Sequence, residues 1–233
     1  MNKEFTGLSA AENPAAAVVD SIALSDLLRT GSSSAHAIAE KNPLMVALVR
    51  GEVRERMYLA LLKYLQPIYS SLEASLYIHR KSATFEGLEL AAILRSGPLR
   101  SDVDFFEERL DREVELPNGG MCFEYAARLE ELARKSPELL IAHVYTRYLG
   151  DLSGGQMIKK SVRKALHLTG GDGTQFYDFK EIEHTGLYKR RFRQWMDSLL
   201  FTDSVKRAIC DETIEAFRLN YMLADEVWKN YQN

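Results

Sequence analysis

This 233-residue chain contains five histidines, whose side chains could bind a metal. They are His36, His79, His143, His167 and His184. No two of them stand four residues apart, which is the spacing with which one helix face clamps a metal ion, and no HExxH or Cys/His cluster occurs. A zinc or di-iron site of the kind found in helical bundles is therefore not predicted.

His36 is the best candidate for a ligand of haem iron, which a single imidazole can hold. Ala35 and Ala37 flank it and leave room for a wide planar molecule. Glu40 follows one turn later and can accept a hydrogen bond from the second ring nitrogen, which would fix the tautomer. On these residues alone, a histidine that is merely exposed or hydrogen-bonded in the core remains the favoured alternative.

Residues 145–156, YTRYLGDLSGGQ, place three glycines inside a segment with helical periodicity from about 137 to 168. Each glycine costs a helix about 1 kcal/mol relative to alanine, so the bare backbone suggests a kink or the close approach of a flat ligand. Gly150 and Gly154 share one face, and Asp151 lies about 100° round the helix from Gly150. The residues support a pocket role for Asp151 and a solvated surface role about equally.

Two cations complete the candidate chemistry. Lys189 and Arg193 are one turn apart and share a helix face, which suits a ligand with paired carboxylates. A solvated basic face is the simpler interpretation of these residues by themselves. The chain has no GxSxG motif, no phosphate-binding loop and no dinucleotide fingerprint, so nucleophilic catalysis and nucleotide binding are not predicted.

The overall composition is that of a soluble globular protein, with 46% hydrophobic and 27% charged residues. A net charge of -3 gives no reason to expect nucleic acid or a membrane surface as a partner. No apolar run approaches the roughly 18 residues of a spanning helix, and we expect no membrane anchor in this chain. Only two cysteines occur, without metal or redox spacing, which favours a reducing compartment.

The elements that must position these residues are all predicted to be helices, seven to nine of them around one core. Residues 1–20 are predicted to form a mobile N-terminal arm and residues 21–233 a single catalytic domain. The Ser-Gly-Pro sequence at 96–98 is expected to separate two short helices. Helices are expected near residues 22–39 (with a weak centre at 31–34), 43–49, 53–79 (kinked at Pro67), 85–95, 102–113, 121–135, 137–168 (with a serine cap at 136), 177–200 and 203–229.

The twelve residues 145–156 resemble the signature of the biliverdin-producing haem oxygenases of the animal and bacterial type, with all three glycines and the aspartate in place. This match is far more specific than a short motif. Further resemblance covers residues 34–40, which look like the family's proximal-histidine segment. It extends to residues 69–73, 136–143, 188–193 and 216–220, and so to nearly the whole chain.

The resemblance implies an all-α fold with haem between a proximal helix and a kinked distal helix. Haem b would be both substrate and cofactor, and O₂ and reducing equivalents would open its ring to biliverdin, CO and ferrous iron. His36 would bind the iron, and Asp151 would hold a distal water network. The resemblance implies as haem-binding residues Arg29, His36, Glu40, Tyr145, Lys189, Arg193 and Phe217, and as catalytic residues Tyr69, Arg147, Gly150, Asp151 and Gly154.

One departure from the family pattern affects the expected partner. The family's proximal helix carries several lysines before the histidine, whereas residues 31–34 here are Gly-Ser-Ser-Ser, and Arg29 is the one basic residue at a matching position. The basic face for an electron donor, a flavoprotein reductase or a ferredoxin, would then rely on Arg190, Arg191, Lys206 and Arg207.

We expect a cytoplasmic monomer, or a protein on the cytosolic face of the endoplasmic reticulum if a C-terminal anchor has been removed. The alternative function is a non-catalytic haem-binding or haem-sensing protein of the same fold. The least favoured hypothesis is an all-α scaffold or a protein that binds another planar ligand, because a scaffold does not need the glycines in that helix.

Overall fold

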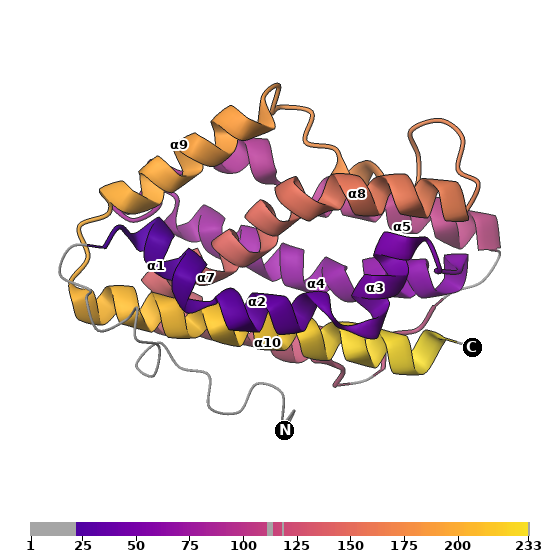
Figure 1. Cartoon of the computed structure of the whole chain (residues 1–233), viewed down its shortest axis with the longest axis horizontal. Coiled ribbons are helices and arrows are strands. Elements are labelled where there is room, and N and C mark those ends of the chain that lie inside the picture. The colour runs from indigo at the N-terminus through magenta and orange to yellow at the C-terminus, as the bar shows by residue number, and fades with distance from the viewer. Residues whose placement is uncertain (1–21, 111–113, 118, 233) are drawn as a thin grey trace.

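The computed structural model of the chain describes residues 22–110, 114–117 and 119–232. The predicted N-terminal arm, residues 1–20, lies outside the described residues. Within those ranges the chain folds into helices and has no strand, which confirms the all-α prediction (Figure 1). The α-helices are α1 Leu24–Gly31, α2 Ser33–Glu40, α3 Pro43–Arg50, α4 Glu55–His79, α5 Ser96–Leu110, α6 Met121–Lys135, α7 Leu140–Val144, α8 Gly150–Ala165, α9 Thr185–Ser198 and α10 Asp203–Tyr231.

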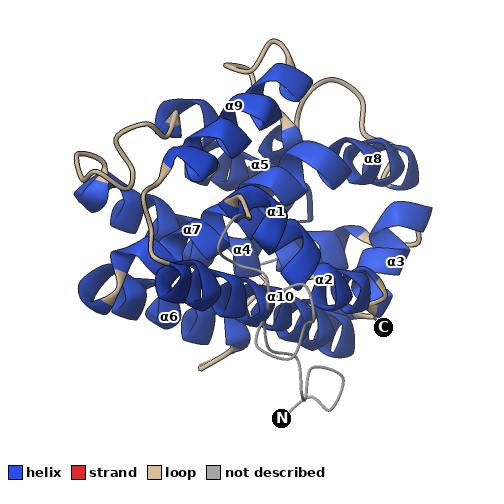
Figure 2. Ribbon diagram, turned by 60° about the vertical axis from the view of Figure 1, so that its left-hand side comes forward, coloured by secondary structure: helices blue, strands red, loops and turns tan. Residues whose placement is uncertain are grey.

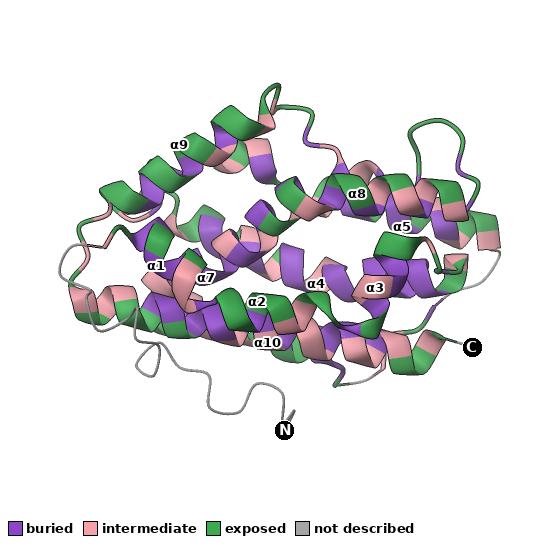
Figure 3. Ribbon diagram, in the orientation of Figure 1, coloured by how far each residue is buried: buried purple, intermediate pink, exposed green. Residues whose placement is uncertain are grey.

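Helix α4 runs through the middle of the molecule and packs against α5, α6 and α10 (Figures 1 and 2). Its apolar residues recur every three or four positions, and Ile68 and Leu72 are completely buried. The helix continues through Pro67. Tyr69 of the same helix is also completely buried, so α4 brings a polar hydroxyl into an apolar core. Figure 3 shows how the buried residues line the inward sides of the surrounding helices.

The weak centre predicted at residues 31–34 is a break between α1 and α2 at Ser32. Ser32 is buried, and its hydroxyl donates to the carbonyl of Leu28 at 2.6 Å. A Cβ atom at Gly31 would lie 2.4 Å from Sγ of Cys210 on α10. Glycine is therefore required at the break because α10 passes so close to it.

The prediction for residues 85–113 was wrong in two respects. Residues 85–95 form turns and a short 3₁₀ helix, Leu90–Ile93, in place of a regular helix. Ser96, Gly97 and Pro98 do not separate two helices but open α5. Proline is tolerated in a first turn, and the Glu73 carboxylate of α4 accepts hydrogen bonds from the backbone N–H of Arg95 and of Ser96.

The glycine-bearing segment is not one regular helix. It begins with a 3₁₀ turn, Pro137–Leu139, without a side-chain cap from Ser136, and passes through α7 into a π-helical turn, Tyr145–Leu149, before α8. α9 begins at Thr185, later than predicted, because a short 3₁₀ helix, Gln175–Tyr177, and a loop at residues 178–184 precede it. These interruptions and the break at Ser32 divide the described chain into more α-helices than the seven to nine expected.

The loop before α9 is held by a buried carboxylate of α5. Asp102 is completely buried, and it accepts hydrogen bonds from the backbone N–H of Gln175 at 2.8 Å and of Phe176 at 2.7 Å. Arg95 donates to the carbonyls of Phe176 and Asp178 at 3.2 and 2.6 Å. Together these bonds hold Phe176 and its neighbours against α4 and α8.

None of the helices within the described ranges is long and apolar enough to cross a membrane.

Burial raises the pKa of Asp102 to about 6 against the two backbone hydrogen bonds, which lower it. The folded state thus binds this proton more tightly than the unfolded chain, so the stability that it contributes falls as the pH rises from 3.8 to about 6. Relative to Asp102→Asn, the unfolding free energy of the wild type should fall by about 3 kcal/mol across this window, at about 1.4 kcal/mol per pKa unit.

Urea denaturation at a series of pH values measures this difference. Asp104→Asn, at an exposed position of the same helix, is the matched control and should run parallel to the wild type. Parallel curves for Asp102→Asn and the wild type would contradict the assignment.

Candidate functional site

Asp151 and Tyr69 meet in the core between α8 and α4. The Tyr69 hydroxyl donates a hydrogen bond to Oδ2 of Asp151, and Nε of Arg147 donates to the Tyr69 hydroxyl oxygen at 3.0 Å. Arg147 stands one turn before Asp151, with 3.9 Å between Nη2 and Oδ1. The structure thus brings together the three distal residues that the sequence singled out.

Asn220 of α10 is a fourth member that sequence reasoning did not assign to the site. Its Oδ1 accepts a hydrogen bond from Nη1 of Arg147 at 2.7 Å. Asn220 ends the segment 216–220 that carries part of the family resemblance, which is the signal that could have identified it. The Arg147 guanidinium therefore connects α4, α8 and α10 through one set of hydrogen bonds.

The charges in this cluster are largely removed from water, since only 14% of the Arg147 side chain and 11% of the Asp151 side chain are exposed. Burial raises the pKa of Asp151, although Arg147, the Tyr69 hydrogen bond and Arg95 each lower it. Burial also lowers the pKa of Arg147, but Tyr69 and Asp151 raise it by more. Arg147 therefore stays a cation, and burial makes Asp151 easier to protonate than an aspartate in water.

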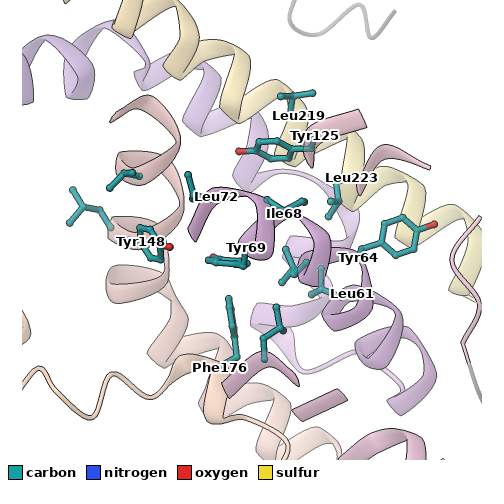
Figure 4. Packing of buried hydrophobic residues seen from close by; sticks show 14 of the residues in the cluster. Leu61, Tyr64, Ile68, Tyr69, Leu72, Tyr125, Tyr148, Phe176, Leu219 and Leu223 are labelled. Atoms are coloured by element: carbon teal, nitrogen blue, oxygen red, sulfur yellow. The ribbon is translucent and has the colours of Figure 1, made fainter. Parts of the chain in front are cut away.

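Aromatic rings enclose the Tyr69 side of the cluster. Figure 4 shows Tyr69 between Tyr148 and Phe176, whose ring centroids lie 5.9 and 5.3 Å from that of Tyr69. The Tyr148 hydroxyl is buried and has no hydrogen-bond partner in the structure. Buried hydroxyls are normally satisfied, so this polar atom beside Asp151 is consistent with a site that holds water.

The three glycines of α8 do two different things. A Cβ atom at Gly155 would lie 2.8 Å from the Tyr177 ring, so this glycine allows close packing. A Cβ atom at Gly150 or at Gly154 would meet nothing within 4 Å. The helix face that carries these two glycines is therefore open backbone, which a flat ligand can approach.

His36 lies on α2, and 53% of its side chain is exposed. Its ring meets Phe217 of α10 edge to face, with centroids 5.2 Å apart. Nε2 of His36 lies 3.6 Å from Oε1 of Glu40, which is longer than a hydrogen bond. His36 thus has an accessible imidazole that contacts the Phe217 ring and has the Glu40 carboxylate within ion-pair distance.

The predicted carboxylate-binding residues come from three elements. Tyr145 of the π-helical turn lies near Arg193 of α9 and Arg29 of α1: burial raises the pKa of its hydroxyl, and both arginines lower it. Arg29 is exposed and also pairs with Asp26 at 3.0 Å. Nζ of Lys189 donates to the Ser153 hydroxyl at 3.2 Å, so α9 reaches the glycine-bearing helix. These groups form a basic rim between α1, α9 and the distal segment.

Elsewhere in the described residues, no group of three or more His, Cys, Asp and Glu side chains could hold a metal ion. The arrangement therefore offers one accessible imidazole, one open glycine face with a buried carboxylate behind it, and cations at the rim.

Comparisons with known proteins agree with this arrangement. The family described as Heme oxygenase matches residues 22–226. The chain is 35% identical to a heme oxygenase of Rhodella violacea, with 88% of this chain and 86% of the relative covered. It is similar to the crystal structure of heme oxygenase-1 from Synechocystis in complex with heme, at 31% identity and a TM-score of 0.83, covering 90% and 94% of the two chains. The heme oxygenase of Leptospira interrogans gives 32% identity and a TM-score of 0.81, covering 88% of this chain and 100% of that chain.

The two environments of the glycines predict opposite effects of alanine on the ligand-free protein. Gly154→Ala should raise the unfolding free energy by about 0.5–1 kcal/mol, because it removes a helix glycine without a new contact. Gly155→Ala should lower it by about 1–3 kcal/mol, because the methyl group collides with Tyr177. Urea denaturation of the pair measures both changes, and shifts of the same sign would contradict the distinction between the two faces.

Proposed function

The chain belongs to the haem oxygenase family, and from that premise we propose how its own residues act on haem. The protein opens haem to biliverdin, CO and ferrous iron with O₂ and reducing equivalents. The observation that carries the proposal is the buried carboxylate of Asp151, held by Tyr69 one residue away from an open glycine face. Bound haem supplies both the redox-active iron and the ring that is oxidised.

The residues fit haem as a ligand. We assign the iron to His36, because its imidazole is accessible and its local partner Glu40 can turn to accept a hydrogen bond from the second ring nitrogen. Phe217, which meets the His36 ring edge to face, fixes the ring orientation. The open backbone at Gly150 and Gly154 would leave room for the flat macrocycle.

The propionate groups are assigned to the basic rim. Arg193 and Lys189 of α9, with Arg29 of α1 and the Tyr145 hydroxyl, offer charge-assisted hydrogen bonds to two carboxylates. Arg29 must give up part of its exposed pair with Asp26 to take part, which costs little because exposed pairs contribute about 0–1 kcal/mol. This grip determines which edge of the ring faces the distal helix.

Asp151 is assigned to proton delivery. Its Oδ2 is occupied by the Tyr69 hydroxyl, while Oδ1 lies 3.9 Å from Arg147 and can accept a hydrogen bond from a water molecule. A water molecule held by the carboxylate would deliver the proton and regain one from the solvent, so no strong acid or base touches the reacting centre directly. Arg147 and Tyr69 keep the carboxylate in place, and Asn220 in turn holds Arg147. Without that organised water, a non-catalytic haem-binding protein would result.

The electron donor is inferred to be a flavoprotein reductase or a ferredoxin that docks on the cations around α9 and α10. Arg191 is engaged with Glu89 at 2.6 Å, and Lys206 donates to the carbonyl of Ile22 at 3.3 Å. Arg190 and Arg207 are exposed and can meet an acidic partner. We further propose a monomer in the cytoplasm, where the buried free thiols of Cys122 and Cys210 stay reduced.

Replacing Asp151 tests the assignment of the distal carboxylate. Asp151→Ala should bind haem with unchanged affinity but form biliverdin at least about 100-fold more slowly, because proton delivery contributes about 10²–10⁴-fold. Absorbance under ascorbate or a reductase in air follows the loss of the haem Soret band and the growth of the biliverdin band. Asp225→Ala, which removes a carboxylate paired with Lys229 on α10, is the control. A normal biliverdin yield from Asp151→Ala would refute the role.

Replacing His36 tests the axial ligand. His36→Ala should lose most activity, because the iron has no protein ligand, and added imidazole should restore part of it. The absorbance spectrum of the haem complex should change in the same variant and recover with imidazole. His184→Ala, at the exposed start of α9 and without a side-chain cap bond, should behave as wild type. Full activity of His36→Ala without imidazole would contradict the assignment.

A further inference from the structure

His143 is a completely buried histidine of α7 that the proposed reaction does not use. Its Nδ1 lies 3.0 Å from the Tyr125 hydroxyl of α6, and its Nε2 lies 3.0 Å from Oε1 of Glu212 on α10. Both ring nitrogens are therefore engaged, and the two partners come from different helices. The donor and acceptor roles of the two nitrogens depend on which of them carries the hydrogen.

The Glu212 carboxylate determines the role of Nε2 of His143. Burial raises the pKa of Glu212, but hydrogen bonds from His143 and Arg128 lower it by more. Arg128 donates to both carboxylate oxygens, at 2.6 Å from Nη2 and 3.2 Å from Nε. An ionised carboxylate can only accept hydrogen bonds. Nε2 of His143 must therefore be the donor.

In the neutral imidazole only one ring nitrogen carries hydrogen, and the other is an acceptor. With Nε2 the donor to Glu212, Nδ1 of His143 is the acceptor, and the Tyr125 hydroxyl donates to it.

The direction set at Tyr125 continues into the distal site. With its hydrogen given to His143, the Tyr125 oxygen can accept from the side-chain amide of Asn220. Burial raises the pKa of Tyr125, and the hydrogen bond from Asn220 acts in the opposite direction. The Asn220 nitrogen also donates to the carbonyl of Ala216 at 2.8 Å. Its oxygen is thereby turned to Arg147, from which it accepts at 2.7 Å. Arg147 then donates to Tyr69, and Tyr69 to Asp151.

We propose that Glu212 and His143 are positioning residues that set the donor and acceptor direction of this hydrogen-bond chain and so orient Arg147 and Tyr69 around Asp151. The effect on turnover rests on the proposed function, whereas the tautomer of His143 does not. Reversal at His143 would turn the Asn220 nitrogen toward Arg147 and place two donors face to face. The acceptor for Nη1 of Arg147 would be lost, although no residue that contacts the ligand had changed.

The tautomer is measured on the ligand-free protein by the ¹⁵N chemical shifts of the imidazole nitrogens. We expect His143 to carry hydrogen on Nε2 and none on Nδ1. His79 gives a reference in the same spectrum, because its Nε2 lies 2.8 Å from the carbonyl of Ala133 and must donate to it. An imidazolium at His143, or hydrogen on Nδ1 alone, would overturn the proposal.

Glu212→Gln tests the carboxylate, because an amide can donate as well as accept and no longer obliges Nε2 to be the donor. The Nε2–H signal of His143 should weaken, and biliverdin formation should slow about tenfold while haem affinity stays unchanged. Glu107→Gln, which removes a carboxylate paired with Lys63 on α4, is the matched control and should change neither readout. If only one of the two readouts changes in Glu212→Gln, or neither does, the proposal fails.

Tyr125→Phe breaks the chain at a milder position, by removing a single hydroxyl. It should leave the His143 tautomer unchanged and slow biliverdin formation to a similar extent. In its background, Glu212→Gln should cause no further loss of rate, because the connection to Asn220 is already broken. Additive losses in the double variant would show that the two residues act separately, which contradicts the proposal. A wild type that shows the expected tautomer but does not turn over haem would refute the proposed function alone.

Discussion

A buried guanidinium needs acceptors for its N–H groups, and Arg147 finds them on helices that are far apart in the sequence. Tyr69 of α4, Asn220 of α10 and Asp151 of α8 surround it. Removing one partner of a buried charge pair costs about 3–5 kcal/mol, so these helices are tied to one another at this residue. The distal carboxylate, the glycine face in front of it and the chain behind it that leads to Glu212 all depend on where Arg147 is held.

The glycine-bearing segment shows how one helix serves both the core and the ligand. The π-helical turn, Tyr145–Leu149, precedes α8 and carries Arg147, and π turns are frequent at functional sites. Beyond it, Gly155 packs against Tyr177, whereas Gly150 and Gly154 leave bare backbone on the other face. Alanine at all three positions would be a better helix sequence. The glycines lower the stability of the helix, but they allow close packing on one side and access for a ligand on the other.

The sequence predicted helices best where periodicity and local end signals agreed. Pro43 at the start and Gly51, with φ of 71°, at the end bound α3 as expected. The prediction failed at residues 96–98, where local propensity indicated a break. There the Glu73 carboxylate, 23 residues earlier in the chain, accepts the backbone N–H groups at the start of α5. This contact between residues far apart in the sequence outweighed the local signal. A short window around residues 96–98 does not include Glu73 and so could not predict it.

For the site, residue identity and spacing made His36, Asp151 and the glycines on either side of it candidates, and the family resemblance favoured them over the simpler interpretations. Those features are local, since one helical turn decides which side chains share a face. Asn220, and the chain through Tyr125 and His143 to Glu212, could not be found in this way. Which atom donates and which accepts is decided only when helices from separate parts of the chain bring these groups within 3 Å, and so that part of the chemistry belongs to the tertiary structure.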